Sequence, residues 1–116
     1  MGQSKSSDLE AAFELIGEFK EGRFDSGSDI SARQLALLRL LRADLLPNEV
    51  TLDADLGHLV LRVADEDTHW NHKTMDVIDA IYSLRSNGNP EEASSLQQRF
   101  LHECPSRWYR DIVDAV

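Results

Sequence analysis

Apolar side chains recur along most of the chain at intervals of three and four residues, the spacing of one face of an α-helix. The densest run lies in residues 31–46, where the leucines cover more than one stripe. They are Leu35, Leu37, Leu38, Leu40, Leu41, Leu45 and Leu46. A helix that is apolar on several sides is contacted by several neighbours. We therefore expect this helix at the centre of the core.

Capping boxes mark the beginnings of two expected helices. Ser31 stands three residues before Gln34, and Ser7 stands three residues before Glu10. In this motif the two side chains bind backbone N–H groups that the first helical turn leaves without partners. We expect helices to begin at these two serines, and residues 1–7 to form a disordered polar tail.

Proline and glycine mark where other helices end. Pro47 and Pro105 each end a helix, because proline lacks the N–H and restricts the residue before it. Asn87 and Gly88 favour the left-handed backbone that stops a helix. Together these signals predict a mainly α protein, a compact single domain of four to five helices over residues 8–116.

Residues 50–63 fit two structures. Their apolar positions match one helical face, but they also alternate as in two strands around an Asp/Gly-rich turn at 53–57. An isolated two-stranded ribbon is only marginally stable. The helix agrees with the rest of the chain and is favoured, and a short β-hairpin at 50–63 is the alternative.

The acidic run Asp65-Glu66-Asp67, followed by Thr68, predicts a connection and the start of a new helix. Carboxylates at this place favour the positive end of the helix dipole. The apolar positions that follow, from Trp70 to Tyr82, then define one long helix.

Composition and charge narrow the class of protein. The 116 residues carry a formal net charge of −9, which argues against binding nucleic acid, because nucleic-acid-binding domains are usually basic. Cys104 is the single cysteine, so a disulfide within the chain is excluded and a reducing compartment is favoured. Neither a signal peptide nor a membrane span is expected, since the apolar runs are short. We expect a soluble cytoplasmic protein.

No motif for catalysis or for a cofactor stands out. His69 and His72 lie near acidic residues, but they lack the second ligand pair of a typical metal site. Asp53 and Asp55 begin like a calcium-binding loop, yet that loop requires glycine and glutamate where the chain has His58 and Ala64. We therefore expect no metal, no cofactor and no catalytic residue.

Two features are candidates for binding a partner. The first is the segment 47–67, which contains one arginine and six acidic residues: Glu49, Asp53, Asp55, Asp65, Glu66 and Asp67. The second is the adjacent aromatic pair Trp108 and Tyr109, residue types that often dominate interface energies. Docking of this pair into the protein's own core is the alternative.

These features indicate a non-enzymatic, acidic protein-binding module with a basic protein partner. Immunity proteins and antitoxins that neutralise cationic nuclease toxins share this small, acidic, cofactor-free profile, so an inhibitor of a basic protein is one form of the hypothesis. The alternative is a helical regulatory or assembly module that self-associates, for example as a homodimer, or docks on a larger complex. A small metal-dependent enzyme or sensor using His69 and His72 ranks third.

Overall fold

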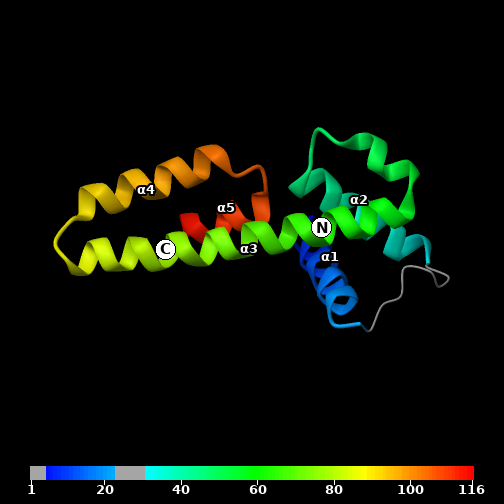
Figure 1. Cartoon of the computed structure of the whole chain (residues 1–116), viewed down its shortest axis with the longest axis horizontal. Helices are drawn as coiled ribbons and strands as arrows, with labels where there is room; N and C mark the ends of the chain where they lie inside the picture. Colours follow the sequence, from blue (N-terminus) through cyan, green and yellow to red (C-terminus); the bar gives the residue numbers. More distant parts are fainter. Residues whose placement is uncertain (1–4, 23–30) are drawn as a thin grey trace. The chain divides into compact units, whose positions relative to one another are not determined.

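The prediction of a mainly α fold is confirmed by a computed structural model of the chain, which describes residues 5–22 and 31–116. All regular secondary structure in these ranges is helical (Figure 1). It consists of α1 (Lys5–Lys20), α2 (Ala32–Leu45), the 3₁₀ helix η1 (Val50–Ala54), α3 (Leu56–Ser86), α4 (Pro90–Glu103) and α5 (Arg107–Asp114). Each of these described helices is too short or too polar to cross a membrane.

Contacts between residues divide the chain into two compact units, Met1–Asp67 and Thr68–Val116. The boundary falls inside α3, whose first half belongs to the first unit and whose second half belongs to the second. A single domain over residues 8–116 stays a prediction. Of the tail expected over residues 1–7, residues 5–7 lie in α1, which begins two residues before Ser7, and residues 1–4 lie outside the described ranges.

The core of the first unit includes leucines of α2, which packs against α1 and against η1. Leu38 and Leu41 are completely buried, and Leu45 is nearly so. Ala12 and Ile16 of α1 are buried in the same unit. This pattern agrees with the expectation that the 31–46 helix is central, because its leucines contact more than one neighbouring element.

The predicted cap of α2 is confirmed. The Ser31 hydroxyl accepts a hydrogen bond from the backbone N–H of Gln34 at 3.0 Å, and the Gln34 side chain accepts one from the N–H of Ser31 at 2.9 Å. At the other end α2 stops at Leu45, two residues before Pro47. Local signals therefore define both ends of this helix.

The helical alternative for residues 50–63 is confirmed, because η1 and the beginning of α3 occupy this stretch and residues 31–116 contain no strand. The connection expected at residues 65–68 is wrong, because α3 continues through it. Between Gly57 and Gly88 the chain has neither glycine nor proline, so nothing interrupts the helix. An acidic run is equally compatible with a helix start and with a helix interior whose carboxylates have basic partners.

In the second unit α4 runs back alongside α3, and α5 follows it (Figure 1). The turn between α3 and α4 depends on Gly88, whose φ is +79°. The N–H of Asn89 donates to the carbonyl of Leu84 at 2.8 Å, and the N–H of Gly88 donates to that of Arg85 at 3.2 Å. These two hydrogen bonds together form a Schellman motif, which confirms the predicted end of the helix at Asn87 and Gly88.

Helix α4 ends at Glu103, before Pro105, as predicted. Helix α5 begins after Ser106, whose hydroxyl accepts a hydrogen bond from the N–H of Tyr109 at 3.2 Å. The core of this unit includes Trp70 and Phe100, whose rings meet edge to face with centroids 5.8 Å apart. Such contacts stabilise a helix pair beyond simple burial of area.

Candidate protein-binding surface

The six acidic residues predicted to bind a partner all belong to the first unit, on or beside η1 and on the first half of α3. The structure divides them into two groups. Among the described residues of the unit, four of the carboxylates form ion pairs with lysine or arginine and two form none. They are Glu49, Asp53, Glu66 and Asp67 in the first group, and Asp55 and Asp65 in the second.

Asp53 is held by Arg42, a buried arginine of α2. The guanidinium Nε lies 3.0 Å from Asp53 Oδ1 and Nη2 lies 3.3 Å from Oδ2, so the pair is bidentate. Arg42 also donates to the carbonyl of Leu46 at 3.2 Å, beyond the end of α2. The charge of Asp53 is therefore neutralised inside the unit, and it ties η1 to α2.

Glu49 and Glu66 share Arg62. The two guanidinium Nη atoms lie 3.2 Å from Glu49 Oε2 and 3.1 Å from Glu66 Oε1. The hydrogen bond with Glu66 raises the pKa of the Arg62 guanidinium above its usual value, and the negative charge of Glu49 raises it further. Arg62 is thus a shared counter-ion for these two carboxylates.

Asp67 pairs with Lys20 of α1, with Nζ 2.5 Å from Oδ2. Asp67 is only 7% exposed, so this carboxylate joins two helices and is withdrawn from the surface. Together with Asp53, it shows that part of the acidic segment serves the fold. A new cationic partner for either carboxylate would compete with the internal lysine or arginine that already neutralises it.

Asp55 and Asp65 remain accessible. Asp55 precedes α3, where its Oδ1 accepts a hydrogen bond from the N–H of His58 at 3.3 Å and its Oδ2 lies 3.0 Å from His58 Nδ1. Asp65 is exposed and forms no ion pair with any residue in the described ranges. Both carboxylates can therefore meet a partner's cation without losing a lysine or arginine partner of their own.

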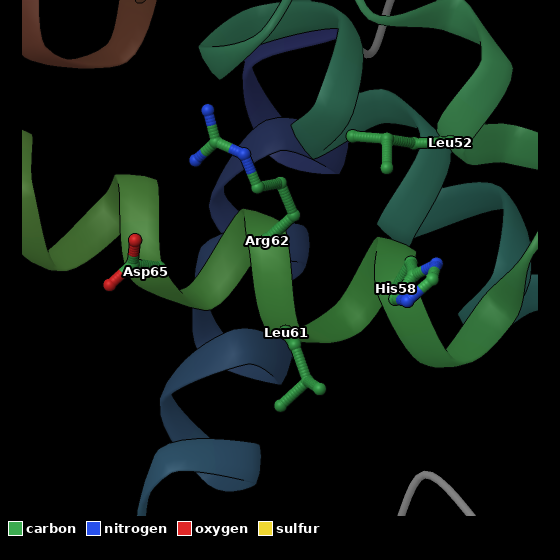
Figure 2. A pocket seen from close by; sticks show the side chains of 5 residues that line it. All are labelled: Leu52, His58, Leu61, Arg62 and Asp65. Carbon is green, nitrogen blue, oxygen red and sulfur yellow. The ribbon is translucent and has the colours of Figure 1, made fainter.

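An open hollow of about 430 Å³ lies between η1 and the first turns of α3 and includes Asp65 in its lining (Figure 2). It is lined by Leu52 of η1 and by four residues on successive turns of α3: His58, Leu61, Arg62 and Asp65. The Leu61 side chain is 60% exposed, and nearby in sequence Val50 is 59% exposed. An apolar patch rimmed by polar groups can mark a site that binds another protein, which makes Leu61 and this hollow the candidate to test.

Leu61 was not among the predicted site residues, because the candidates were chosen by charge and by aromatic character. In the helix favoured for residues 50–63, the intervals from His58 to Leu61 and from Leu61 to Asp65 are three and four residues, so the three share one helix face. The spacing therefore carried this signal in the sequence.

Trp108 and Tyr109 lie in the second unit, on α5. Tyr109 is 5% exposed and packs in the core of that unit, whereas Trp108 is half-buried. Of the two predictions for this pair, docking into the protein's own core therefore holds for Tyr109, whereas Trp108 keeps part of its surface exposed. The structure does not gather these aromatics into one unit with the six acidic residues.

Metal-binding residues are not clustered in the described part of the chain. No group of three or more His, Cys, Asp or Glu side chains is arranged to hold a metal ion in residues 5–22 or 31–116. His69 and His72 are exposed on α3.

Comparison of the chain with protein-family models, with curated proteins and with solved structures found no match.

Proposed function

We propose that the chain is a non-enzymatic protein-binding module whose first unit binds a basic partner, in the manner of an acidic inhibitor of a cationic protein. The observation that supports this most directly is the exposed Leu61, which lines one hollow together with the accessible Asp65 and with His58, the partner of the accessible Asp55. A basic segment with one large apolar side chain matches this arrangement. We propose the cytoplasm as its location, because the single cysteine suits a reducing compartment.

The distribution of charge between the units supports the choice of surface. Residues 1–67 hold fourteen acidic and seven basic residues, a net charge of −7. Residues 68–116 hold seven acidic and five basic residues, a net charge of −2. The first unit therefore attracts a cationic protein more strongly during diffusional encounter.

Apolar and charged groups have different tasks on such a surface. Burial of Leu61 supplies binding free energy, on the order of 1.5–3 kcal/mol for a fully buried large aliphatic side chain. Asp55 and Asp65 supply orientation and a faster association rate, because exposed charges act mainly during encounter. The four paired carboxylates contribute to the field but stay in their internal ion pairs.

The charge reversal Asp55→Lys with Asp65→Lys tests this surface. We expect the association rate constant for a synthetic amphipathic peptide of lysines and leucines to fall about tenfold at low salt. The difference from the unmodified protein narrows at high salt, because screening removes the steering. Stopped-flow mixing with a fluorescently labelled peptide measures both effects.

The matched control is Asp79→Lys with Asp114→Lys, which changes the net charge equally but lies on exposed positions of the second unit. It is expected to lower the rate much less. If both double variants slow association equally, only the total charge of the protein matters. An unchanged association rate for Asp55→Lys with Asp65→Lys would show that these two carboxylates do not belong to the binding surface.

A second candidate function is self-assembly through the second unit. Met75 and Tyr82 of α3 are 55% and 53% exposed, and their spacing of seven residues places them on one helix face. This candidate predicts a homodimer that persists at high salt, since apolar contacts are not screened.

Light scattering after size-exclusion chromatography tests the assembly candidate. We expect Met75→Lys with Tyr82→Lys to convert the dimer to a monomer, and Leu61→Lys in the first unit to leave the dimer intact. A monomer for the unmodified protein at both low and high salt would reject self-assembly.

A further inference from the structure

A second hollow lies between α3 and α4 in the second unit, and the proposed function makes no use of it. Its volume is about 210 Å³. Four apolar or aromatic and four charged side chains line it: Trp70, Val77, Leu96 and Phe100, then Lys73, Asp76, Arg99 and Glu103. Sites for drug-sized ligands begin at roughly 300 Å³, so this hollow suits a molecule of about the size of one amino acid.

The aromatic part of the lining is formed by two rings that are mostly buried. Trp70 and Phe100 are 8% and 5% exposed, and their rings meet edge to face at an interplanar angle of 90°. The indole Nε1 of Trp70 is buried and has no hydrogen-bond acceptor among the described residues. Because this atom has almost no accessible surface, a ligand in the hollow contacts the ring and does not bond to the N–H.

The charged part of the lining is balanced in sign. Helix α3 contributes Lys73 and Asp76, and α4 contributes Arg99 and Glu103. None of the four forms an ion pair with another residue in the described ranges. The Lys73 ammonium instead lies 5.4 Å from the centroid of the Trp70 ring, a cation–π distance.

A ligand with a single charge meets as many like charges as opposite charges in this lining. A ligand with an ammonium and a carboxylate a few ångströms apart can place each beside its opposite and keep its apolar part on the aromatic rings. Each contact at such an exposed rim is weak, so the affinity depends on both charges together with the apolar contact.

We propose that this hollow binds an apolar amino acid in its zwitterionic form. The side chain of the ligand packs on Trp70 and Phe100. Its carboxylate is attracted by Lys73 and Arg99, and its ammonium is attracted by the carboxylates of Asp76 and Glu103. The site lies wholly in the second unit and does not depend on the binding of a basic protein by the first.

The probe for this proposal is L-phenylalanine, titrated into the full chain. The readout is the Trp70 indole N–H resonance in a ¹H–¹⁵N correlation spectrum, assigned by comparison with Trp108→Phe. We expect a saturable shift of this resonance. Phenethylamine lacks the carboxylate and 3-phenylpropionate lacks the ammonium, and each is expected to bind about three- to fivefold more weakly than phenylalanine.

Two single substitutions assign the charges. Arg99→Gln is expected to lower the affinity for phenylalanine and for phenylpropionate about threefold and to leave the affinity for phenethylamine unchanged. Glu103→Gln is expected to lower the affinity for phenylalanine and for phenethylamine and to leave the affinity for phenylpropionate unchanged. Arg110→Gln, an exposed change outside the hollow, is the control and alters none of the three affinities. The absence of a saturable shift, equal affinity for all three probes, or the same loss in both variants would overturn the proposal.

Discussion

Replacing Leu41 with alanine is expected to lower the free energy of unfolding by about 3 kcal/mol, since removal of a fully buried leucine side chain forfeits its burial and leaves a cavity. Leu41 is 0% exposed, in the α2 face that packs in the core of the first unit. The measurement is urea denaturation followed by the helical circular dichroism signal.

Leu61→Ala is the matched control, because it is the same substitution at a side chain that is 60% exposed. It is expected to change the free energy of unfolding by about 0.5 kcal/mol or less. The control also bears on function: loss of peptide affinity without loss of stability is the result expected of a binding residue. A large destabilisation by Leu61→Ala would show that this side chain supports the fold.

Replacing Arg42 with alanine is expected to lower the free energy of unfolding by about 3 kcal/mol, the lower end of the range for breaking a buried ion pair. The Arg42 side chain is 9% exposed and the Asp53 side chain is 30% exposed, so water can hydrate the carboxylate that remains. The loss also includes the hydrogen bond to the carbonyl of Leu46 beyond the end of α2.

Arg39→Ala is the control for Arg42, because Arg39 lies on the same helix, is exposed and makes one hydrogen bond, to the backbone carbonyl of Asp53 at 3.2 Å. Its expected effect is about 0.5 kcal/mol or less. Equal destabilisation by the two variants would show that the bidentate, buried geometry of Arg42 contributes nothing beyond an ordinary surface contact.

The sequence predicted those parts of the fold that depend on neighbouring residues. The cap formed by Ser31 and Gln34, the stop at Gly88 and the break at Pro105 each depend on a few adjacent positions, and each is confirmed. The connection expected at residues 65–68 was wrong because the acidic run was interpreted as a helix start, although residues 58–87 contain no glycine or proline to interrupt the helix. The basic partner of one of these carboxylates could not be predicted from the sequence. Asp67 meets Lys20, which lies 47 positions away and is invisible to a local pattern.

The candidate surface was predicted only in its approximate place. Counting charges identified residues 47–67, but could not separate carboxylates that bind Arg42, Arg62 or Lys20 from those that remain accessible. That separation depends on tertiary packing. The same limit applies to Tyr109, which is 5% exposed on α5, a helix that packs against α4.

The most direct test of the central claim is a map of backbone amide shifts on addition of the lysine- and leucine-containing peptide. We expect saturable shifts concentrated on the lining of the hollow, at Leu52, His58, Leu61, Arg62 and Asp65, and at Asp55, which pairs with His58. Leu61→Ala should weaken the interaction while the spectrum of the free protein stays folded. Saturable shifts confined to residues 68–116, or no saturable shift at all, would contradict the assignment of the first unit as the surface that binds a basic partner.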